Sequence, residues 1–123
     1  MREVPMLTEL NITYQIWHDV LKHIPKPTRY TLGTKVDNLF TDLIGCILTA
    51  RYAKGSETRA ILLRGSRTLD LLKYFMTLLW QIHVLKHNTY AQLADKLSHI
   101  GNMLGKWIAR FPQEKRNPDI TGE

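Results

Sequence analysis

Apolar residues recur at intervals of three and four positions along most of the chain, which is the period of a helix that buries one face. The first such segment runs from about residue 7 to residue 23 and then meets Pro25 and Pro27, which force extended backbone. This segment predicts an amphipathic helix whose apolar stripe is Leu7, Leu10, Tyr14, Trp17, Leu21 and Ile24.

The second segment follows Thr31, a candidate N-cap, and stops before Gly55, which suits a left-handed helix end. Ser56 is placed to cap the next helix. Two adjacent seams predict contacts with more than one neighbour. The first seam is Leu32, Val36, Leu39, Leu43, Cys46 and Ala50, and the second is Phe40, Ile44, Ile47 and Leu48.

The third segment, about residues 57–85, is apolar over most of its circumference. One seam is Leu62, Leu69, Leu72, Met76 and Leu79, and the other is Leu71, Phe75, Leu78 and Ile82. Such a helix is usually buried on two sides, and in a chain this small we expect the second side to meet another subunit. The sequence therefore predicts an oligomer with Phe75 and Trp80 at its interface.

The fourth segment begins after Asn88, a candidate cap, and ends before Pro112; its stripe is Tyr90, Leu93, Leu97, Ile100, Leu104, Trp107 and Phe111. No turn signal of a β-hairpin occurs. Four amphipathic helices with short connections predict an all-α fold, an antiparallel up-down four-helix bundle over residues 1–112. We expect the polar residues 113–123 to form a flexible tail.

Three glycines inside the predicted helices have two interpretations. Gly101 and Gly105 lie four apart, and Gly45 lies in the second helix. Each costs about 1 kcal/mol relative to alanine in a helix. They either allow close approach of a helix or a subunit, or they are merely tolerated.

Composition excludes several classes of protein. One cysteine in 123 residues excludes a disulfide framework, a four-cysteine zinc site and an iron–sulfur cluster. No apolar run approaches the roughly 20 residues of a membrane span. No apolar segment follows Arg2, and we expect a cytoplasmic protein without a membrane partner.

Charge is the strongest functional signal. The formal net charge is +6, and the whole excess lies in two segments. Residues 51–73 hold six basic and two acidic residues, and residues 96–116 hold five basic and one acidic. In an up-down bundle these segments meet at one end. A basic patch binds phosphates by releasing counterions, so nucleic acid is the favoured partner; a solubilising face is the alternative.

The candidate contacts to nucleic acid or to a protein partner are Arg51, Lys54, Arg59, Arg64, Arg67, Lys106 and Arg110. Arg29 is a weaker candidate because its position at a helix junction serves the fold. Tyr52, beside Arg51, is placed to stack on a base, although packing against the loop is the favoured interpretation. No motif for sequence-specific readout is present.

Catalytic and metal-binding patterns are missing from the sequence. Of five histidines, only His83 and His87 have the spacing of one helical face, and no neighbouring ligand completes a site. Cys46 lies in a predicted buried seam, where a thiol is inert. No nucleophile elbow, P-loop or dinucleotide fingerprint occurs. We predict no metal, no cofactor and no enzymatic activity.

Two stretches resemble a known family. The junction of the first two helices in a group of small bacterial and phage four-helix bundles is similar to Ile24-Pro25-Lys26-Pro27-x-Arg29-Tyr30-Thr31-Leu32-Gly33. The last helix of one branch, Avd, the accessory variability determinant of diversity-generating retroelements, resembles Ile100-Gly101-x-Met103-Leu104-Gly105-x-Trp107-Ile108-Ala109-Arg110. A sister branch, encoded in intervening sequences of ribosomal RNA genes, carries a Ser-Ile-x-x-Asn-Ile-Ala-Glu-Gly-like stretch that residues 38–45 match poorly.

The resemblance implies a basic, barrel-shaped homopentamer without catalytic activity of its own. It implies association with a reverse transcriptase and with nucleic acid, the template-repeat RNA or its cDNA, during mutagenic reverse transcription. The alternative is a structural or interaction bundle of the ribosomal intervening-sequence type, which predicts weak nucleic-acid binding. Salt-dependent RNA binding and a neighbouring reverse-transcriptase gene discriminate the two.

Overall fold

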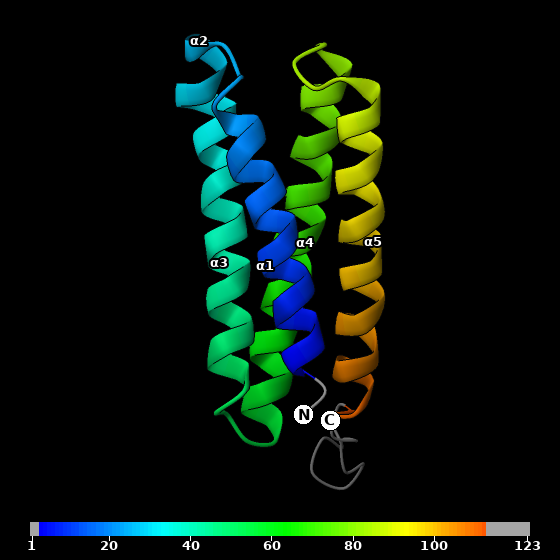
Figure 1. Ribbon diagram of the computed structural model, residues 1–123. Helices are drawn as coiled ribbons and strands as arrows, with labels where there is room; N and C mark the ends of the chain where they lie inside the picture. Colours follow the sequence, from blue (N-terminus) through cyan, green and yellow to red (C-terminus); the bar gives the residue numbers. More distant parts are fainter. Residues whose placement is uncertain (1–2, 113–123) are drawn as a thin grey trace, which may run out of the picture.

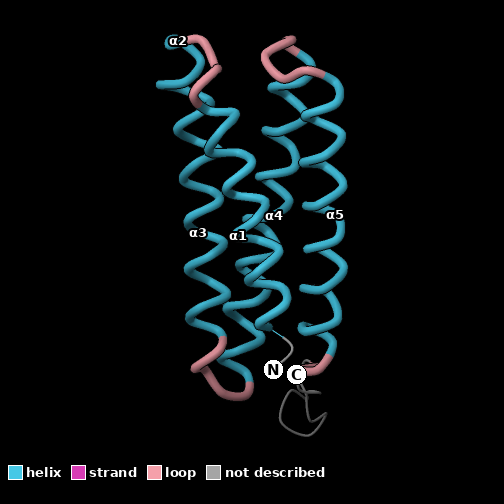
Figure 2. Tube along the Cα trace, in the orientation of Figure 1, coloured by secondary structure: helices cyan, strands magenta, loops and turns pink. Residues whose placement is uncertain are grey.

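The computed structural model describes residues 3–112, in which four long helices run up and down (Figure 1). These are α1 (Glu3–Leu21), α3 (Thr34–Ala50), α4 (Ser56–Gln81) and α5 (His87–Ala109). A short helix, α2 (Lys26–Thr28), and a π-helical turn, η1 (Arg29–Gly33), lead directly into α3. Figure 2 shows helices joined by short loops and no strand in the described part of the chain. The predicted all-α four-helix bundle is confirmed; the predicted tail lies outside the described residues.

Each long helix packs against two others. α3 contacts α1 and α4, and α5 contacts α4 and α1, so the four helices close into a bundle. The α1–α3 and α4–α5 connections lie at one end, and the α3–α4 loop lies at the other (Figure 1). The end of α5 also lies at the α3–α4 loop end. Short loops between antiparallel neighbours produce this arrangement.

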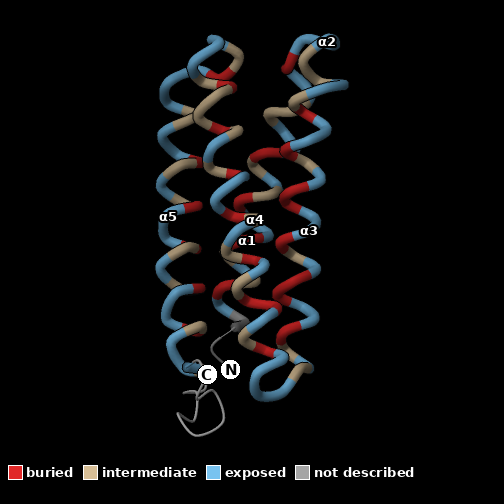
Figure 3. Tube along the Cα trace, turned by 180° about the vertical axis from the view of Figure 1, so that it is seen from behind, coloured by how far each residue is buried: buried red, intermediate tan, exposed pale blue. Residues whose placement is uncertain are grey.

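The core contains the inward seams of all four helices (Figure 3). Trp17 of α1 and Phe40 of α3 are fully buried, and their rings stack with centroids 6.2 Å apart. Burying a side chain of this size contributes about 2–3 kcal/mol through the hydrophobic effect. The predicted inward seams are confirmed at their central positions, which include Leu10, Leu43 and Leu72.

The half-buried carboxylate of Asp37 links α3 to α1. Asp37 accepts a hydrogen bond from the Tyr14 hydroxyl at 2.8 Å and another from Trp17 Nε1 at 3.3 Å. Desolvation by burial, together with the hydrogen bond to Asp37 and its negative charge, raises the pKa of Tyr14 above 10.0. The contact therefore favours the neutral, hydrogen-donating phenol.

The first junction differs from the prediction. Pro25 is extended, with φ −55° and ψ 143°, but helical backbone resumes at Lys26, with Pro27 in the first turn. Proline is well tolerated in a first turn because its missing N–H has no intrahelical partner there. Thr31 is therefore not an N-cap: its hydroxyl lies inside η1 and donates to the Pro27 carbonyl at 2.9 Å.

Two side-chain features hold this junction together. The Arg29 guanidinium donates to the carbonyls of Lys22 and Ile24, at 3.0 and 2.9 Å for Nη2. A Cβ on Gly33 would lie 3.0 Å from Leu21 Cδ1, so the Leu21 side chain packs tightly against this glycine. The structural role expected for Arg29 is confirmed.

The other two connections also correct details of the prediction. Gly55 does have a positive φ of 59°, but it stands immediately before α4 rather than at the end of α3, which stops at Ala50. Ser56 is then helical and makes no side-chain cap. α4 ends at Gln81, because His83 has a φ of 65°, and α5 begins at His87, so Asn88 lies inside the helix.

The glycines separate into two kinds. A Cβ on Gly101 would lie 3.2 Å from Lys73 Nζ and 3.4 Å from Leu69 Cδ2, which are the ends of two side chains of α4. Gly45 and Gly105 have open space where a Cβ would stand. Side chains of α4 therefore fill the space beside Gly101, whereas no described residue lies within 4 Å of a Cβ at the other two, and the close-approach interpretation stays a prediction.

Candidate nucleic-acid and polymerase interface

The helix ends that carry the predicted basic residues lie at the same end of the bundle, as expected (Figure 1). The end of α3, the start of α4 and the end of α5 meet there. A hydrogen bond from Arg59 Nη1 to the Phe111 carbonyl, 2.8 Å long, joins the start of α4 to the chain just after α5. We call this the basic end; its candidate residues are Arg51, Lys54, Arg59, Arg64, Arg67, Lys106 and Arg110.

Five of the seven candidate residues are exposed. Arg51 and Arg59 are half-buried, and the rest, Lys54, Arg64, Arg67, Lys106 and Arg110, are open to solvent. Arg59 uses part of its guanidinium on a backbone carbonyl, which assigns it a structural contact that the sequence did not reveal. Within residues 3–112 the only ion pair joins Lys22 to Asp19, far from this end, so the exposed cations of the basic end carry no carboxylate partner there.

Arg64 opens onto a groove between α3 and α4 with a volume of about 390 Å³. The groove is lined by Thr41, Asp42, Gly45, Cys46, Thr49, Arg64 and Thr68. The three threonine hydroxyls each donate to a carbonyl of their own helix, between 2.8 and 3.1 Å. Their hydrogens are therefore already used, and Arg64 is the cation of this groove.

Tyr52 does not pack against the loop, so the favoured interpretation was wrong. Its side chain is 80% exposed, and the Arg51 guanidinium lies 5.8 Å from its ring centroid. The α3–α4 loop therefore presents an open aromatic ring beside cationic side chains.

The described residues cover the outer seam of α4 only in part. Leu71 and Ile82 are 48% and 47% exposed, and Phe75 and Leu78 are half-buried. We call these four residues the outer strip. Phe75 belongs to it, with Lys35 Nζ 6.0 Å from its ring centroid. Trp80 instead stacks on Tyr90 of α5, with centroids 4.7 Å apart, so its packing partner lies in the same chain. A role at a subunit interface stays a prediction for both.

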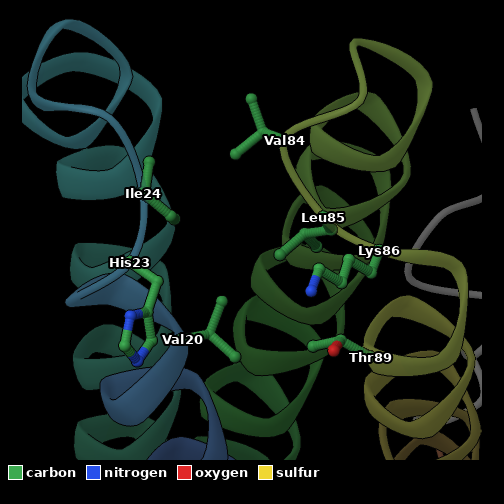
Figure 4. A pocket seen from close by; sticks show the side chains of 7 residues that line it. All are labelled: Val20, His23, Ile24, Val84, Leu85, Lys86 and Thr89. Atoms are coloured by element: carbon green, nitrogen blue, oxygen red, sulfur yellow. The ribbon is translucent and has the colours of Figure 1, made fainter.

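The opposite end of the bundle is chemically different. It has a cavity of about 240 Å³ between the end of α1 and the α4–α5 connection (Figure 4). Apolar walls and a few polar groups line it: Val20, His23, Ile24, Val84, Leu85, Lys86 and Thr89. Exposed lysines also lie at this end, at positions 22, 26 and 86. They lie outside the two basic segments of the sequence, so the charge distribution along the chain did not predict them. None of the seven candidate residues lines the cavity.

The described residues contain no group of three side chains that fits a metal ion. His83 lies in the turn after α4 and His87 at the start of α5, so the two do not share one helical face as their spacing had indicated. Cys46 is buried and free, as expected. Between residues 3 and 112, no helix has the length and apolar content that crossing a membrane requires.

The fold defines the class first: a small, basic four-helix bundle with exposed arginines gathered at one end. The chain matches a family model described as bAvd-like over residues 7–111, and it belongs to that family. The resemblance drawn from the two sequence stretches is confirmed. A search of curated proteins found no match. The family is one of non-catalytic accessory proteins of diversity-generating retroelements, associated in general with a reverse transcriptase.

Proposed function

We propose that this protein binds nucleic acid through its basic end and supports the retroelement's reverse transcriptase during mutagenic copying of the template-repeat RNA. The observation that carries the proposal is the convergence of exposed cations from the α3–α4 loop, α4 and the end of α5 at one end, without carboxylate partners in the described part of the chain. Unpaired cations on a rigid surface exchange their counterions for phosphates at little conformational cost.

The kind of cation distinguishes the basic end from the opposite end. Arginines predominate at the basic end, and an arginine guanidinium makes bidentate contacts with phosphate. At the opposite end the exposed cations are lysines, and Arg29 is held by backbone carbonyls. The arginine-rich end is therefore the better phosphate-binding surface.

The outer strip supports assembly of several copies. The four apolar residues of the outer strip lie along one line of α4 and its C-cap and are partly exposed to water. A second copy of the chain would bury this apolar face. Family membership makes a homopentamer the expected assembly. A ring of copies would repeat the basic end around its axis, which increases the avidity for a long polyanion.

The test combines light scattering with RNA-binding measurements across a salt series. We expect a pentamer whose affinity for a labelled single-stranded RNA falls steeply with salt, at about 0.7 in log–log slope for each phosphate contact. Charge reversal of Arg64 and Arg67 to glutamate should weaken binding at least tenfold and lower that slope, with unchanged helical content and mass.

The matched control reverses two exposed lysines at the opposite end, Lys22→Glu with Lys26→Glu. It changes the net charge equally, so it should leave most of the binding intact if the basic end is the contact surface. Equal losses in both double variants would show only a diffuse charge effect. A protein indifferent to RNA would favour the structural or interaction bundle, and a parallel pull-down with the reverse transcriptase would then test the protein partner alone.

A further inference from the structure

Tyr52 is the most exposed large side chain of apolar character in the described residues, at 80%. It lies in the α3–α4 loop at the basic end, between Arg51 and Lys54. An aromatic ring left open to water contributes nothing to the core. Its position beside Arg51 and Lys54, which have no carboxylate partner among the described residues, indicates contact with a ligand that has both negative charge and flat apolar faces.

The backbone beneath Tyr52 is held in place. The Arg51 N–H donates to the Ile47 carbonyl at 3.2 Å, and the Tyr52 N–H donates to the Thr49 carbonyl at 3.1 Å. Ala53 follows with a bond to the Ala50 carbonyl at 3.3 Å and packs against the core. The ring therefore projects from an ordered turn, and a ligand that binds it need not first order the loop.

The Arg51 guanidinium lies 5.8 Å from the Tyr52 ring centroid, within the range of a cation–π contact. This contact leaves most of the ring accessible, since four fifths of the side chain is exposed. Nucleobases stack on exposed aromatic rings whatever their identity, while lysine and arginine hold the flanking phosphates. In a duplex the base faces are already stacked on one another.

Building on the proposed function, we propose that Tyr52 stacks on an unpaired base and that Arg51 and Lys54 hold the flanking phosphates. The basic end then prefers single-stranded nucleic acid to duplex of the same length. This preference comes from stacking on the Tyr52 ring, whereas the cations bind the phosphates of single strands and duplexes alike.

The chain offers a matched control. Tyr30, at the opposite end, is 69% exposed and also follows an arginine in sequence. The Arg29 guanidinium, however, is committed to the carbonyls of Lys22 and Ile24. Tyr30 therefore reproduces the exposure and the local sequence of Tyr52, but the arginine beside it is already held by backbone carbonyls.

The experiment measures fluorescence anisotropy with three labelled probes of equal length: an oligothymidylate, an abasic strand and a blunt DNA duplex. The proteins are the full chain and the variants Tyr52→Ala, Tyr52→Phe and Tyr30→Ala. We expect Tyr52→Ala to lose about tenfold in affinity for oligothymidylate, with unchanged affinity for the abasic strand and the duplex. Tyr52→Phe and Tyr30→Ala should bind as the unchanged protein does.

The outcomes separate this proposal from the proposed function. Unchanged oligothymidylate affinity in Tyr52→Ala, or an equal loss on the abasic strand, overturns the stacking role while nucleic-acid binding stands. A change in particle mass of Tyr52→Ala by light scattering would make Tyr52 a subunit contact and would also overturn it. If the unchanged protein binds none of the three probes, nucleic-acid binding at the basic end fails as a whole.

Discussion

The two apolar faces of α4 have similar residue types in the sequence but differ in burial in the structure. The inward seam, which includes Leu69 and Leu72, is buried against α3 and α5, with Leu72 fully inaccessible. The outer strip, which includes Leu71 and Phe75, is half-buried or exposed along the same helix. Adjacent leucines, Leu71 and Leu72, therefore occupy opposite environments one residue apart.

This difference separates folding from association. The inward seam stabilises the single chain because its partners are present in every folded copy. The outer strip gains burial only when something else covers it, so its contribution depends on concentration. Substitutions on the two faces should consequently change different measured quantities.

The largest expected effect is on the inward face. Leu72→Ala should lower the free energy of unfolding by about 2–5 kcal/mol, because it leaves a cavity in a packed core. Leu71→Ala should change it by less than about 1 kcal/mol in dilute protein. Urea denaturation followed by circular dichroism measures both, and equal losses would contradict the assignment of the two faces.

A smaller effect is expected from charges placed on either side of α4. Phe75→Glu should reduce the particle mass in light scattering with little loss of helical content, because Phe75 is only half-buried at the edge of the core. Trp80→Glu should also lower the stability of the chain, since its stack on Tyr90 is worth about 0.5–1.5 kcal/mol beyond the buried area.

If the particle mass is unchanged in Phe75→Glu, the outer strip is not part of the subunit interface. A Trp80→Glu variant that dissociates without loss of stability would place Trp80 between subunits despite its contact with Tyr90. Sedimentation velocity together with thermal unfolding distinguishes these cases.

The smallest expected effect is the difference in stability between alanine variants of two arginines of α4. Arg59→Ala should lose about 1 kcal/mol of stability, because it removes the hydrogen bond that joins the start of α4 to Phe111. Arg67→Ala, an exposed position, should stay within about 0.5 kcal/mol. If Arg67 proves the more destabilising, then the assignment of Arg59 as the structural arginine is wrong; chemical denaturation at two salt concentrations provides the comparison.

Helix identity and order could be predicted from the sequence because apolar spacing reflects burial along each helix. Helix ends were less predictable. Gly55 was correctly expected to have unusual backbone, but on the wrong helix, because a positive φ suits either side of a short loop. Pro27 was interpreted as a break, although a proline fits the first turn of a helix equally well.

The candidate site was predictable as a region and not as individual contacts. The clustering of basic residues along the chain, together with up-down topology, placed the basic end. That Arg59 donates to Phe111, 52 positions away, depends on packing between helices that no local pattern encodes. The exposure of Tyr52 likewise depends on how the loop leaves α3.

By itself the sequence determined the four helices, their inward faces, the basic excess and the family, because each is written in residue type and spacing along one chain. Tertiary structure alone decided which of the α4 seams is covered and which arginines and tyrosines are exposed to solvent. The reason is physical: periodicity records that a side chain is apolar, whereas burial requires a partner, and partners are brought together only when the bundle closes.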